Sequence, residues 1–265
     1  MIGARVETTS SPLPVASFLA GADPRISIVL VTFGTGTLIV SCLERLAAAV
    51  ASDGLDAEVV VVDNWHPRRR NATADLVTIT TSGVRLVISP DNLGFGGGVA
   101  RGVAEASGDL LCLLNPDVEV VPGQLRALAG RVAGARHLVV PAFVRPDGSL
   151  LERGARLLRN GETRFITGLD DRHHRPDDGS AACWMLPRAE FDRLGGFDEA
   201  FHPAYYEDVD FALRFVADGG EIVIADDVEM VHHHQGSTAE APDVECQRRI
   251  FAERWADVLA ARPPA

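Results

Sequence analysis

The feature that most limits the fold of this chain is an alternation of short apolar segments with amphipathic ones through its first half. Residues 26–32 form a β-branched run, and residues 38–50 then place apolar side chains at helical spacing. Strands that alternate with helices are typical of a parallel sheet with helices on both faces. The segment 110–114 is wholly apolar, which predicts a central strand. Further strands are expected at 58–63, 85–88 and 137–140. The fold class is therefore α/β, with a mostly parallel central sheet flanked by helices.

The second half of the chain has a looser pattern. Glycines at 195 and 196 end a short helix at 188–194, and another helix starts at Glu207 and ends at Gly219. Residues 160–180 are polar and read as a surface loop, and residues 1–24 read as a flexible arm. The remaining expectations are a helix opened by Pro122, a turn at 146–148, strands at 181–187, 221–225 and 228–231, and a last helix at 243–260.

Charge and composition exclude several kinds of site. The net charge is −12, so the basic surface that nucleic-acid binding needs is not expected. All basic residues apart from histidine are arginine, which excludes Schiff-base chemistry and a P-loop lysine. An anionic ligand would need local help from a metal ion, backbone N–H groups or a few arginines.

Cysteine spacing and hydropathy bear on the compartment. The cysteines are too far apart in sequence for a structural zinc motif and read as buried apolar residues of a reducing compartment. No stretch reaches the length of a membrane span, and the first 24 residues make a poor signal peptide. We therefore expect a cytoplasmic protein. The cysteines are Cys42, Cys112, Cys183 and Cys246.

A glycine-rich segment at residues 92–98 does not match the dinucleotide-binding fingerprint. Counting from Gly94 or Gly96, the third glycine of Gly-x-Gly-x-x-Gly is replaced by Val99 or Arg101. The segment is still expected to turn into a helix where backbone approaches a ligand closely. Tight packing of helix on sheet is the alternative that glycines serve equally well.

Polar side chains follow the predicted strands at points where ligands bind in open α/β sheets. Asp63 ends the second strand, and Asp117 follows the fourth. Asp117 is a candidate magnesium or manganese ligand, and an Asx turn is the structural alternative. Among the three consecutive histidines, His232 and His234 are expected on one face of a strand and His233 on the other. Imidazole also binds divalent metals, and a solvated strand end is the alternative.

An acidic segment near the C-terminal third carries Glu207, Asp208 and Asp210 within four positions. One interpretation is an acidic helix start, with Asp210 paired to Arg214 at i+4. The other is a carboxylate held in a cleft as a general base.

Together these motifs resemble the inverting family 2 glycosyltransferases of the GT-A fold, in particular their rhamnosyltransferase-like branch. The resemblance runs from Ile26 to about Ser237. Its motifs, in order, are Val31-Thr32-Phe33, Val61-Val62-Asp63-Asn64, Asn92 to Gly98, Leu114-Asn115-Pro116-Asp117, Gly195-Gly196-Phe197-Asp198-Glu199, Glu207-Asp208-Val209-Asp210, and His232 before Gly236-Ser237.

The resemblance implies roles for individual residues. Asp208 would be the catalytic base within the Glu207–Asp208 pair. Asp117 would hold Mg²⁺ or Mn²⁺, with His232 as a metal or diphosphate contact; Asn115 stands where the family often has another acid. The residues expected to bind the nucleotide-sugar donor are Thr32, Phe33, Asp63, Asn92, Gly94, Phe95, Gly96, Gly97, Asn115 and Asp117.

The resemblance also implies an organisation and a reaction. A nucleotide-sugar-binding half (25–120) and an acceptor half (121–240) would form one domain, followed by a C-terminal helix (241–265). The enzyme would move a sugar from a nucleotide diphosphate, dTDP-rhamnose first and a UDP-sugar second, to a saccharide, polyprenyl-linked or small-molecule acceptor. A sugar nucleotidyltransferase and a non-catalytic binding module are the rival hypotheses. Peripheral contact with the inner face of the membrane and a homodimer stay open.

Overall fold

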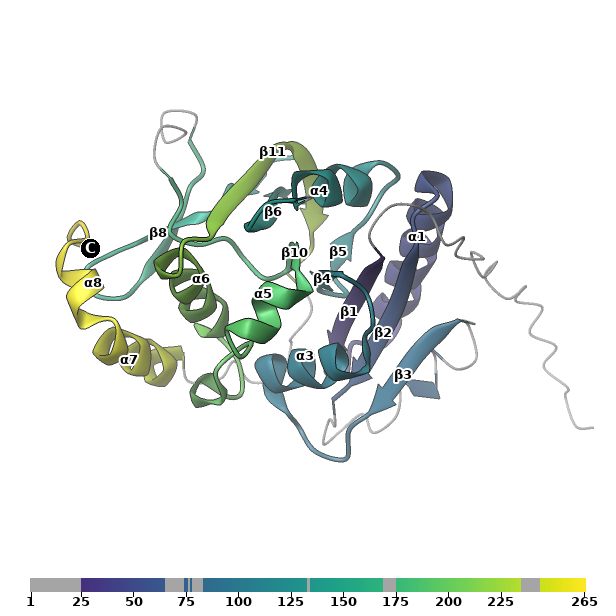
Figure 1. The fold of residues 1–265 in the computed structure, drawn as a ribbon, viewed down its shortest axis with the longest axis horizontal. Coiled ribbons are helices and arrows are strands. Elements are labelled where there is room, and N and C mark those ends of the chain that lie inside the picture. The colour runs from purple at the N-terminus through teal and green to yellow at the C-terminus, as the bar shows by residue number, and fades with distance from the viewer. Residues whose placement is uncertain are drawn as a thin grey trace, which may run out of the picture.

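A computed structural model describes residues 25–64, 74–75, 77, 83–132, 134–168, 175–234 and 244–265 (Figure 1). The predicted N-terminal arm, Gly236 and Ser237 lie outside these residues. Among the described residues, no helix is both long and apolar enough to cross a membrane.

A nine-stranded sheet forms the centre of the molecule, in the order β3-β2-β1-β4-β10-β6-β11-β5, with β7 paired to β6. A separate hairpin is made by β8 and β9. The strands are β1 (Ile26–Thr32), β2 (Ala57–Asp63), β3 (Val84–Ile88), β4 (Leu110–Leu114), β5 (Val118–Glu119), β6 (His137–Val144), β7 (Leu150–Glu152), β8 (Ala155–Leu157), β9 (Thr163–Phe165), β10 (Cys183–Pro187) and β11 (Glu221–His232). The helices are α1 (Leu38–Asp53), α3 (Gly94–Glu105), α4 (Gln124–Val132), α5 (Arg188–Arg193), α6 (Glu207–Ala217), α7 (Val244–Arg254) and α8 (Ala256–Ala260).

The first half of the chain confirms the predicted parallel arrangement. β1 lies between β2 and β4 and is parallel to both, and β3 adds in parallel at the outer edge. All residues of β2 and β4 are buried, as expected for strands covered on both faces. The mostly parallel α/β sheet flanked by helices is confirmed.

The second half mixes strand directions. β10 runs antiparallel to both β4 and β6, whereas β11 is parallel to β6. The two strands predicted at 221–225 and 228–231 form the single strand β11, because an irregularity between Ala225 and Glu229 shifts the register without ending the pairing. β6 also extends to Val144, beyond its predicted end.

Three predictions about the connections are wrong. Pro122 does not open α4, because Gly123 has a left-handed φ of 92° and the helix starts only at Gln124. The predicted loop at 160–180 contains the strand β9, paired with β8. The last helix divides into α7 and α8 at Trp255, whose φ of −105° and ψ of 21° depart from helical values.

α3 packs against β1 and β2 through its glycines. A Cβ on Gly98 would lie 2.6 Å from Val31 Cγ1, and one on Gly102 would lie 2.4 Å from Val29 Cγ1. Both distances are shorter than van der Waals contact, so the helix reaches the sheet only because these positions lack a side chain. The packing alternative is therefore correct for Gly98 and Gly102.

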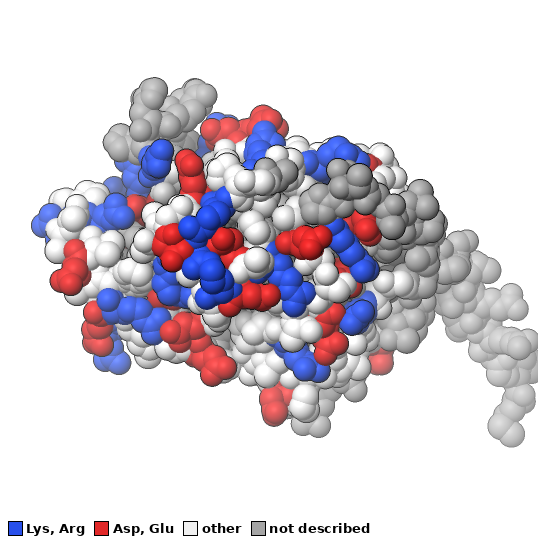
Figure 2. Space-filling model, in the orientation of Figure 1, with Lys and Arg blue, Asp and Glu red and all other residues white. Residues whose placement is uncertain are grey.

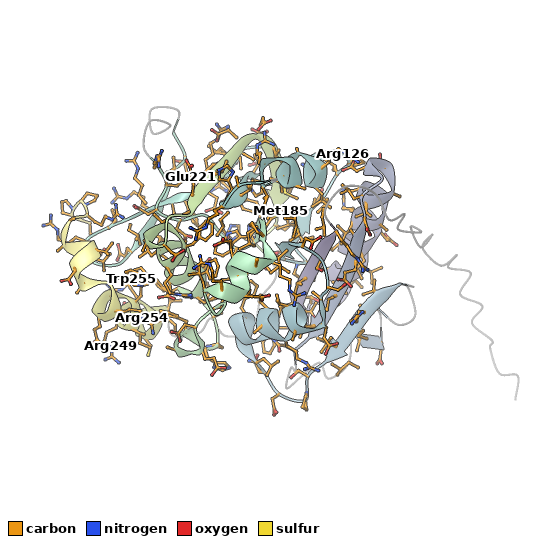
Figure 3. All side chains as sticks on the ribbon, viewed as in Figure 1. Arg126, Met185, Glu221, Arg249, Arg254 and Trp255 are labelled. Atoms are coloured by element: carbon orange, nitrogen blue, oxygen red, sulfur yellow. The ribbon has the colours of Figure 1, made fainter. Side chains whose placement is uncertain are left out.

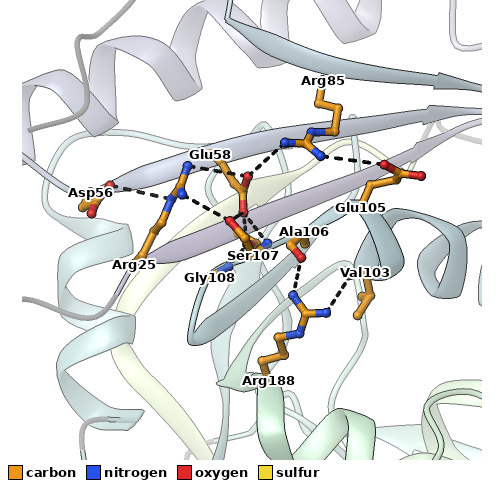
Figure 4. A network of polar contacts seen from close by, with 11 residues as sticks. Arg25, Asp56, Glu58, Arg85, Val103, Glu105, Ala106, Ser107, Gly108 and Arg188 are labelled. Carbon is orange, nitrogen blue, oxygen red and sulfur yellow. Dashed lines mark hydrogen bonds and ion pairs between the residues drawn. The ribbon is translucent and has the colours of Figure 1, made fainter. Parts of the chain in front are cut away.

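The edge of the sheet where the strands begin is closed by a polar network around Glu58 (Figure 4). Glu58 Oε1 accepts hydrogen bonds from Ser27 Oγ at 2.7 Å and from the Ser107 N–H at 2.6 Å. Arg25 Nη2 lies 3.6 Å from Glu58 Oε2. Burial raises the pKa of Glu58, but these hydrogen bonds outweigh it and the pKa is lowered. This network ties β1, β2 and the start of β4 together and leaves the opposite edge for ligands.

Candidate functional site

The topology gathers the predicted site residues at one edge of the sheet. β1, β2, β4 and β11 are parallel to one another, so their C-terminal ends meet at that edge. β10 is antiparallel and begins there. Thr32 and Asp63 end β1 and β2, and His232 ends β11. Ligands bind at this kind of edge in open α/β sheets.

Thr32 and Asp63 are register partners on adjacent strands. The buried Thr32 hydroxyl donates a hydrogen bond to Asp63 Oδ1 at 3.1 Å, and the Ala74 N–H donates to Asp63 Oδ2 at the same distance. Both carboxylate oxygens are thus oriented by local donors. Phe33 follows Thr32 and is half-buried, so the three residues predicted for the nucleotide base lie together.

The glycine-rich segment is held by Asn64, a residue that the sequence analysis did not assign to the site. Asn64 Nδ2 donates to the Gly94 carbonyl at 2.8 Å, and Asn64 Oδ1 accepts from the Leu93 N–H at 3.2 Å. Asn92 Oδ1 accepts from the Gly94 N–H at 3.0 Å. Asn64 directly follows Asp63 at the end of a strand, and this position is the signal that could have identified it.

The same segment contacts the loop that precedes α6. The Phe95 N–H donates to the Pro203 carbonyl at 2.7 Å. Gly94 has a φ of 71°, and a Cβ there would lie 2.4 Å from the Pro203 oxygen. A Cβ on Gly96 would lie 3.1 Å from Phe197 Cβ, and one on Gly97 would lie 3.3 Å from Leu93 Cβ. Several of these glycines therefore serve close packing, and contact with a donor sugar stays a prediction for Asn92, Gly94, Phe95, Gly96 and Gly97.

Asp117 and His232 face each other at the ends of β4 and β11. Asp117 Oδ2 lies 3.4 Å from His232 Nε2, and both side chains are buried. His232 stacks on His234 with ring centroids 4.2 Å apart, whereas His233 Nε2 lies 2.8 Å from Glu119 Oε1. The predicted division of the three histidines between two faces is confirmed.

The donor atoms of this pair suit a divalent cation in part. A carboxylate and an imidazole are both ligands of Mn²⁺ and related ions, and His232 Nδ1 is buried without a hydrogen-bond partner among the described residues. Within that part of the chain, no group of three or more His, Cys, Asp or Glu side chains is arranged to hold a metal. The pair would therefore need oxygens from a diphosphate or water to complete a coordination shell.

Asn115 connects the Asp117 side of the edge to the Asp208 side. The Asn115 N–H donates to the Ala182 carbonyl at 2.8 Å. The neighbouring Ala181 N–H donates to Asp208 Oδ2 at 3.4 Å. Asp117 and Asp208 therefore belong to the same edge, where β4 ends and β10 begins.

Asp208 lies at the start of α6 with a half-buried side chain. Its Oδ1 accepts from the Val209 N–H at 2.9 Å. Burial raises the pKa of Asp208, while the Val209 and Ala181 N–H groups act in the opposite direction. Glu207 is buried, and burial together with the Asp208 charge raises the pKa of Glu207 well above its ordinary value. A carboxylate with raised basicity at a ligand edge suits proton removal.

Asp210 has a structural role. Its buried carboxylate accepts from Arg214 Nε at 2.8 Å and from Arg254 Nη1 and Trp255 Nε1, both at 3.0 Å. The predicted i+4 pair with Arg214 is confirmed. Arg254 and Trp255 come from the C-terminal helices beside α6 (Figure 3), so Asp210 attaches those helices to the element that carries Asp208.

Two further acids near Asp208 were not predicted from the sequence. Glu152 ends β7 and Asp178 precedes β10, and both are buried. Glu152 follows two leucines, and this apolar pair was the signal for a buried strand that ends on an acid. Asp178 lies in a polar stretch that resembles an ordinary turn, so nothing in the sequence distinguished it.

Comparison with known proteins decides the family. The sequence pattern described as Glycosyl transferase family 2 matches residues 27–195, more than half of the chain. This chain belongs to glycosyl transferase family 2. Family membership establishes a glycosyltransferase enzyme and decides against the nucleotidyltransferase and the non-catalytic module.

Two curated relatives of this family 2 enzyme come from bacteria. An N-acetylglucosaminyl-diphospho-decaprenol L-rhamnosyltransferase of Mycobacterium tuberculosis is 28% identical over 247 residues, covering 81% of this chain and 78% of the relative. The O-antigen biosynthesis protein RfbC of Myxococcus xanthus is 28% identical over 173 residues, covering 60% of this chain and 13% of that protein. The rhamnosyltransferase-like character expected from the sequence is confirmed.

Solved GT-A glycosyltransferases share the fold. A structure of GalNAc-T7 with UDP, GalNAc and Mn²⁺ has a TM-score of 0.69 at 14% identity, covering 91% of this chain and 50% of that one. The mannosyltransferase PcManGT of Pyrobaculum calidifontis with GDP-Man and Mn²⁺ has a TM-score of 0.59 at 15% identity, covering 92% of this chain and 66% of that one. The chain thus spans about half to two thirds of these structures, and the likeness confirms the GT-A fold.

The surface is compatible with the acidic composition. On the face shown in Figure 2, acidic and basic side chains are interspersed, without one broad basic area. The exclusion of nucleic acid as a partner remains a prediction from net charge.

Proposed function

We propose that this enzyme transfers a sugar, with inversion at the anomeric carbon, from a nucleotide diphosphate to a hydroxyl group of a lipid-linked saccharide. dTDP-rhamnose is the first candidate donor and a UDP-sugar the second. The relative that covers most of this chain is named as an L-rhamnosyltransferase acting on a decaprenyl-diphosphate-linked GlcNAc, which supports this donor and acceptor class.

The observation that carries the proposal is the position of Asp208 on the same edge as Asp117. The carboxylate of Asp208 is fixed by the Ala181 and Val209 N–H groups at the start of β10 and α6. The acceptor hydroxyl is a weak nucleophile, and a positioned base accelerates its attack roughly 10²–10⁴-fold.

The reaction then follows from the placement of these groups. Asp208 takes the proton of the acceptor hydroxyl as that oxygen bonds to the anomeric carbon. The bond from the anomeric carbon to the diphosphate oxygen breaks on the opposite side, which inverts the configuration. Negative charge accumulates on the departing nucleotide diphosphate, near the edge that carries Asp117 and His232.

Asp117 and His232 are the residues that would hold a divalent cation, Mg²⁺ or Mn²⁺. Mn²⁺ in the GalNAc-T7 and PcManGT structures supports a metal of this class. When bound, such an ion offsets negative charge on a leaving diphosphate. The glycine-rich segment, which is hydrogen-bonded to Asn64 after β2, would cover the donor at the same edge of the sheet.

A thermal-shift panel tests the donor. dTDP, UDP, GDP and ADP are each added with and without Mn²⁺, because a ligand that binds the folded state raises its melting temperature by mass action. We expect dTDP with Mn²⁺ to give the largest rise. A larger response to GDP or ADP would contradict the donor assignment, and no response to any nucleotide would contradict the nucleotide site.

A further inference from the structure

Four acids from three parts of the chain interact electrostatically around the start of α6: Glu152, Asp178, Glu207 and Asp208. The segments that carry the first two run side by side, because the Ala155 N–H donates to the Asp178 carbonyl at 2.7 Å. A Cβ on Gly154 would lie 2.9 Å from the same carbonyl oxygen. Three residues after Asp178, Ala181 donates its N–H to Asp208. The backbone thus brings β7, the start of β10 and α6 together.

Three of these carboxyl groups have little compensation for a charge: backbone hydrogen bonds at Asp178 and Glu207 act against the rise in pKa caused by burial but do not outweigh it. The exposed fractions are 2% for Glu152 and 4% for both Asp178 and Glu207. One oxygen of each is buried without a hydrogen-bond partner among the described residues. Among the described residues, no arginine or histidine forms an ion pair with any of the four acids. Arg153, next to Glu152 in sequence, lies 3.6 Å from Asp226 and from Glu229 instead. An ionised carboxylate in such surroundings is costly, whereas a neutral carboxylic acid is not.

Asp208 is the best place in the cluster for a negative charge. It accepts hydrogen bonds from two backbone N–H groups and lies at a helix N-terminus. Burial and the Asp208 charge raise the pKa of Glu152 to about 8. Burial and the Asp208 charge also raise the pKa of Asp178 well above its ordinary value, although the Gly179 N–H acts in the opposite direction.

We propose that Glu152 and Asp178 are positioning residues for Asp208, held like Glu207 as neutral carboxylic acids, so that the four-acid cluster carries one negative charge and Asp208 carries it. This rests on the proposed role of Asp208 as the base. When Asp208 accepts the proton of the acceptor hydroxyl, the whole cluster becomes neutral. The negative charge of the reacting groups then leaves with the nucleotide diphosphate.

Infrared spectroscopy tests the charge state directly. At pH 7 we expect a C=O stretching band of protonated carboxyl groups that weakens in Glu152→Gln and in Asp178→Asn. The matched control is Glu162→Gln, an exposed glutamate of the β8–β9 hairpin, which should leave the band unchanged. The Glu152 part of the band should disappear with a midpoint near pH 8. In Asp208→Asn the midpoint should move to lower pH, because the neighbouring charge is gone.

The pH dependence of turnover separates this proposal from a merely structural role. If Glu152 is neutral while Asp208 titrates, Glu152→Gln does not change the pH at which kcat/KM falls on the acid side of its pH profile. An ionised Glu152 would raise the Asp208 pKa, and its replacement would shift that limb to lower pH and overturn the proposal. Absence of the infrared band from the wild-type protein would also overturn it. NMR of wild-type protein with ¹³C-labelled glutamate carboxyl groups gives the Glu152 titration without a substitution, and a midpoint near 4.5 would contradict it.

These experiments distinguish a failure of the neutral-acid proposal from a failure of the proposed function. Retained turnover in Asp208→Asn would refute the base, while the infrared band of the wild-type protein would still be present. Loss of the band would refute the neutral acids while leaving the base assignment standing.

Discussion

Asp208 Oδ2 accepts a hydrogen bond from the Ala181 N–H at 3.4 Å, which ties the start of α6 to the start of β10. The next residue, Ala182, accepts from Asn115 at the end of β4. Two hydrogen bonds therefore connect the candidate base to the strand that leads into Asp117. This connection explains how motifs far apart in the sequence serve one reaction.

Replacement of Asp117 by alanine should weaken metal-dependent donor binding. The substitution removes the only carboxylate of the Asp117–His232 pair, so we expect at least about a tenfold loss of affinity for dTDP in the presence of Mn²⁺. Calorimetric titration with Mn²⁺ and with EDTA measures this effect. Asp147→Asn, in an exposed turn, is the control. Titration curves of wild type and Asp117→Ala that coincide in both buffers would count against a metal at this position.

Two helical glycines should respond to alanine in opposite directions. Gly98→Ala places a Cβ 2.6 Å from Val31, and such overpacking costs about 1–3 kcal/mol of unfolding free energy. A Cβ added at Gly130 in α4 would have open space around it, with no neighbouring side chain within 4 Å, so Gly130→Ala should stabilise the fold by about 0.5–1 kcal/mol. Urea unfolding measures both changes. An equal response of the two variants would show that α3 does not pack on β1 as described.

Glu58 should stabilise the fold at neutral pH and lose that effect in acid. Its pKa is lower in the folded protein, so its contribution is present above the unfolded pKa and lost as pH falls through the folded pKa. Glu58→Gln should cost about 1–3 kcal/mol at pH 7, because charge-assisted hydrogen bonds from Ser27 and Ser107 are weakened. The difference from wild type should shrink only as the pH falls below 4.5, the ordinary pKa of a glutamate, as measured by urea unfolding. A constant difference would contradict this account, and Glu44→Gln on the exposed side of α1 serves as control.

Much of the first half of the fold could be predicted because its strands are buried on both faces. The boundaries of β1 and β4 match the expected ones, since an unbroken apolar run has few other ways to be buried. The second half depends on pairings that composition does not encode. The irregularity in β11 lies where this strand pairs with β6, and Trp255, at the break between the last helices, donates to Asp210; both partners are distant in sequence. The β8–β9 hairpin is local, but β9 has only three residues and is mostly exposed, so no apolar run marks it.

The candidate site divides in the same way. Asp63, Asp117 and His232 were predictable because each lies at a strand end, where the fold class places ligands. Asp210 shares its segment with Asp208, yet it faces Arg254 and Trp255, and only the packing of the C-terminal helices separates the two roles. Glu152 and Asp178 reach Asp208 through tertiary contacts and carry no motif.

The central claim is that Asp208 removes the proton of the acceptor hydroxyl. The most direct measurement compares wild type with Asp208→Asn, using dTDP-rhamnose, a short-chain lipid-diphosphate-linked GlcNAc acceptor and Mn²⁺, with dTDP binding measured in parallel. Asparagine keeps the shape and loses the basicity, so the account predicts unchanged dTDP affinity and a fall in kcat of at least about 100-fold. Turnover close to that of wild type would contradict it.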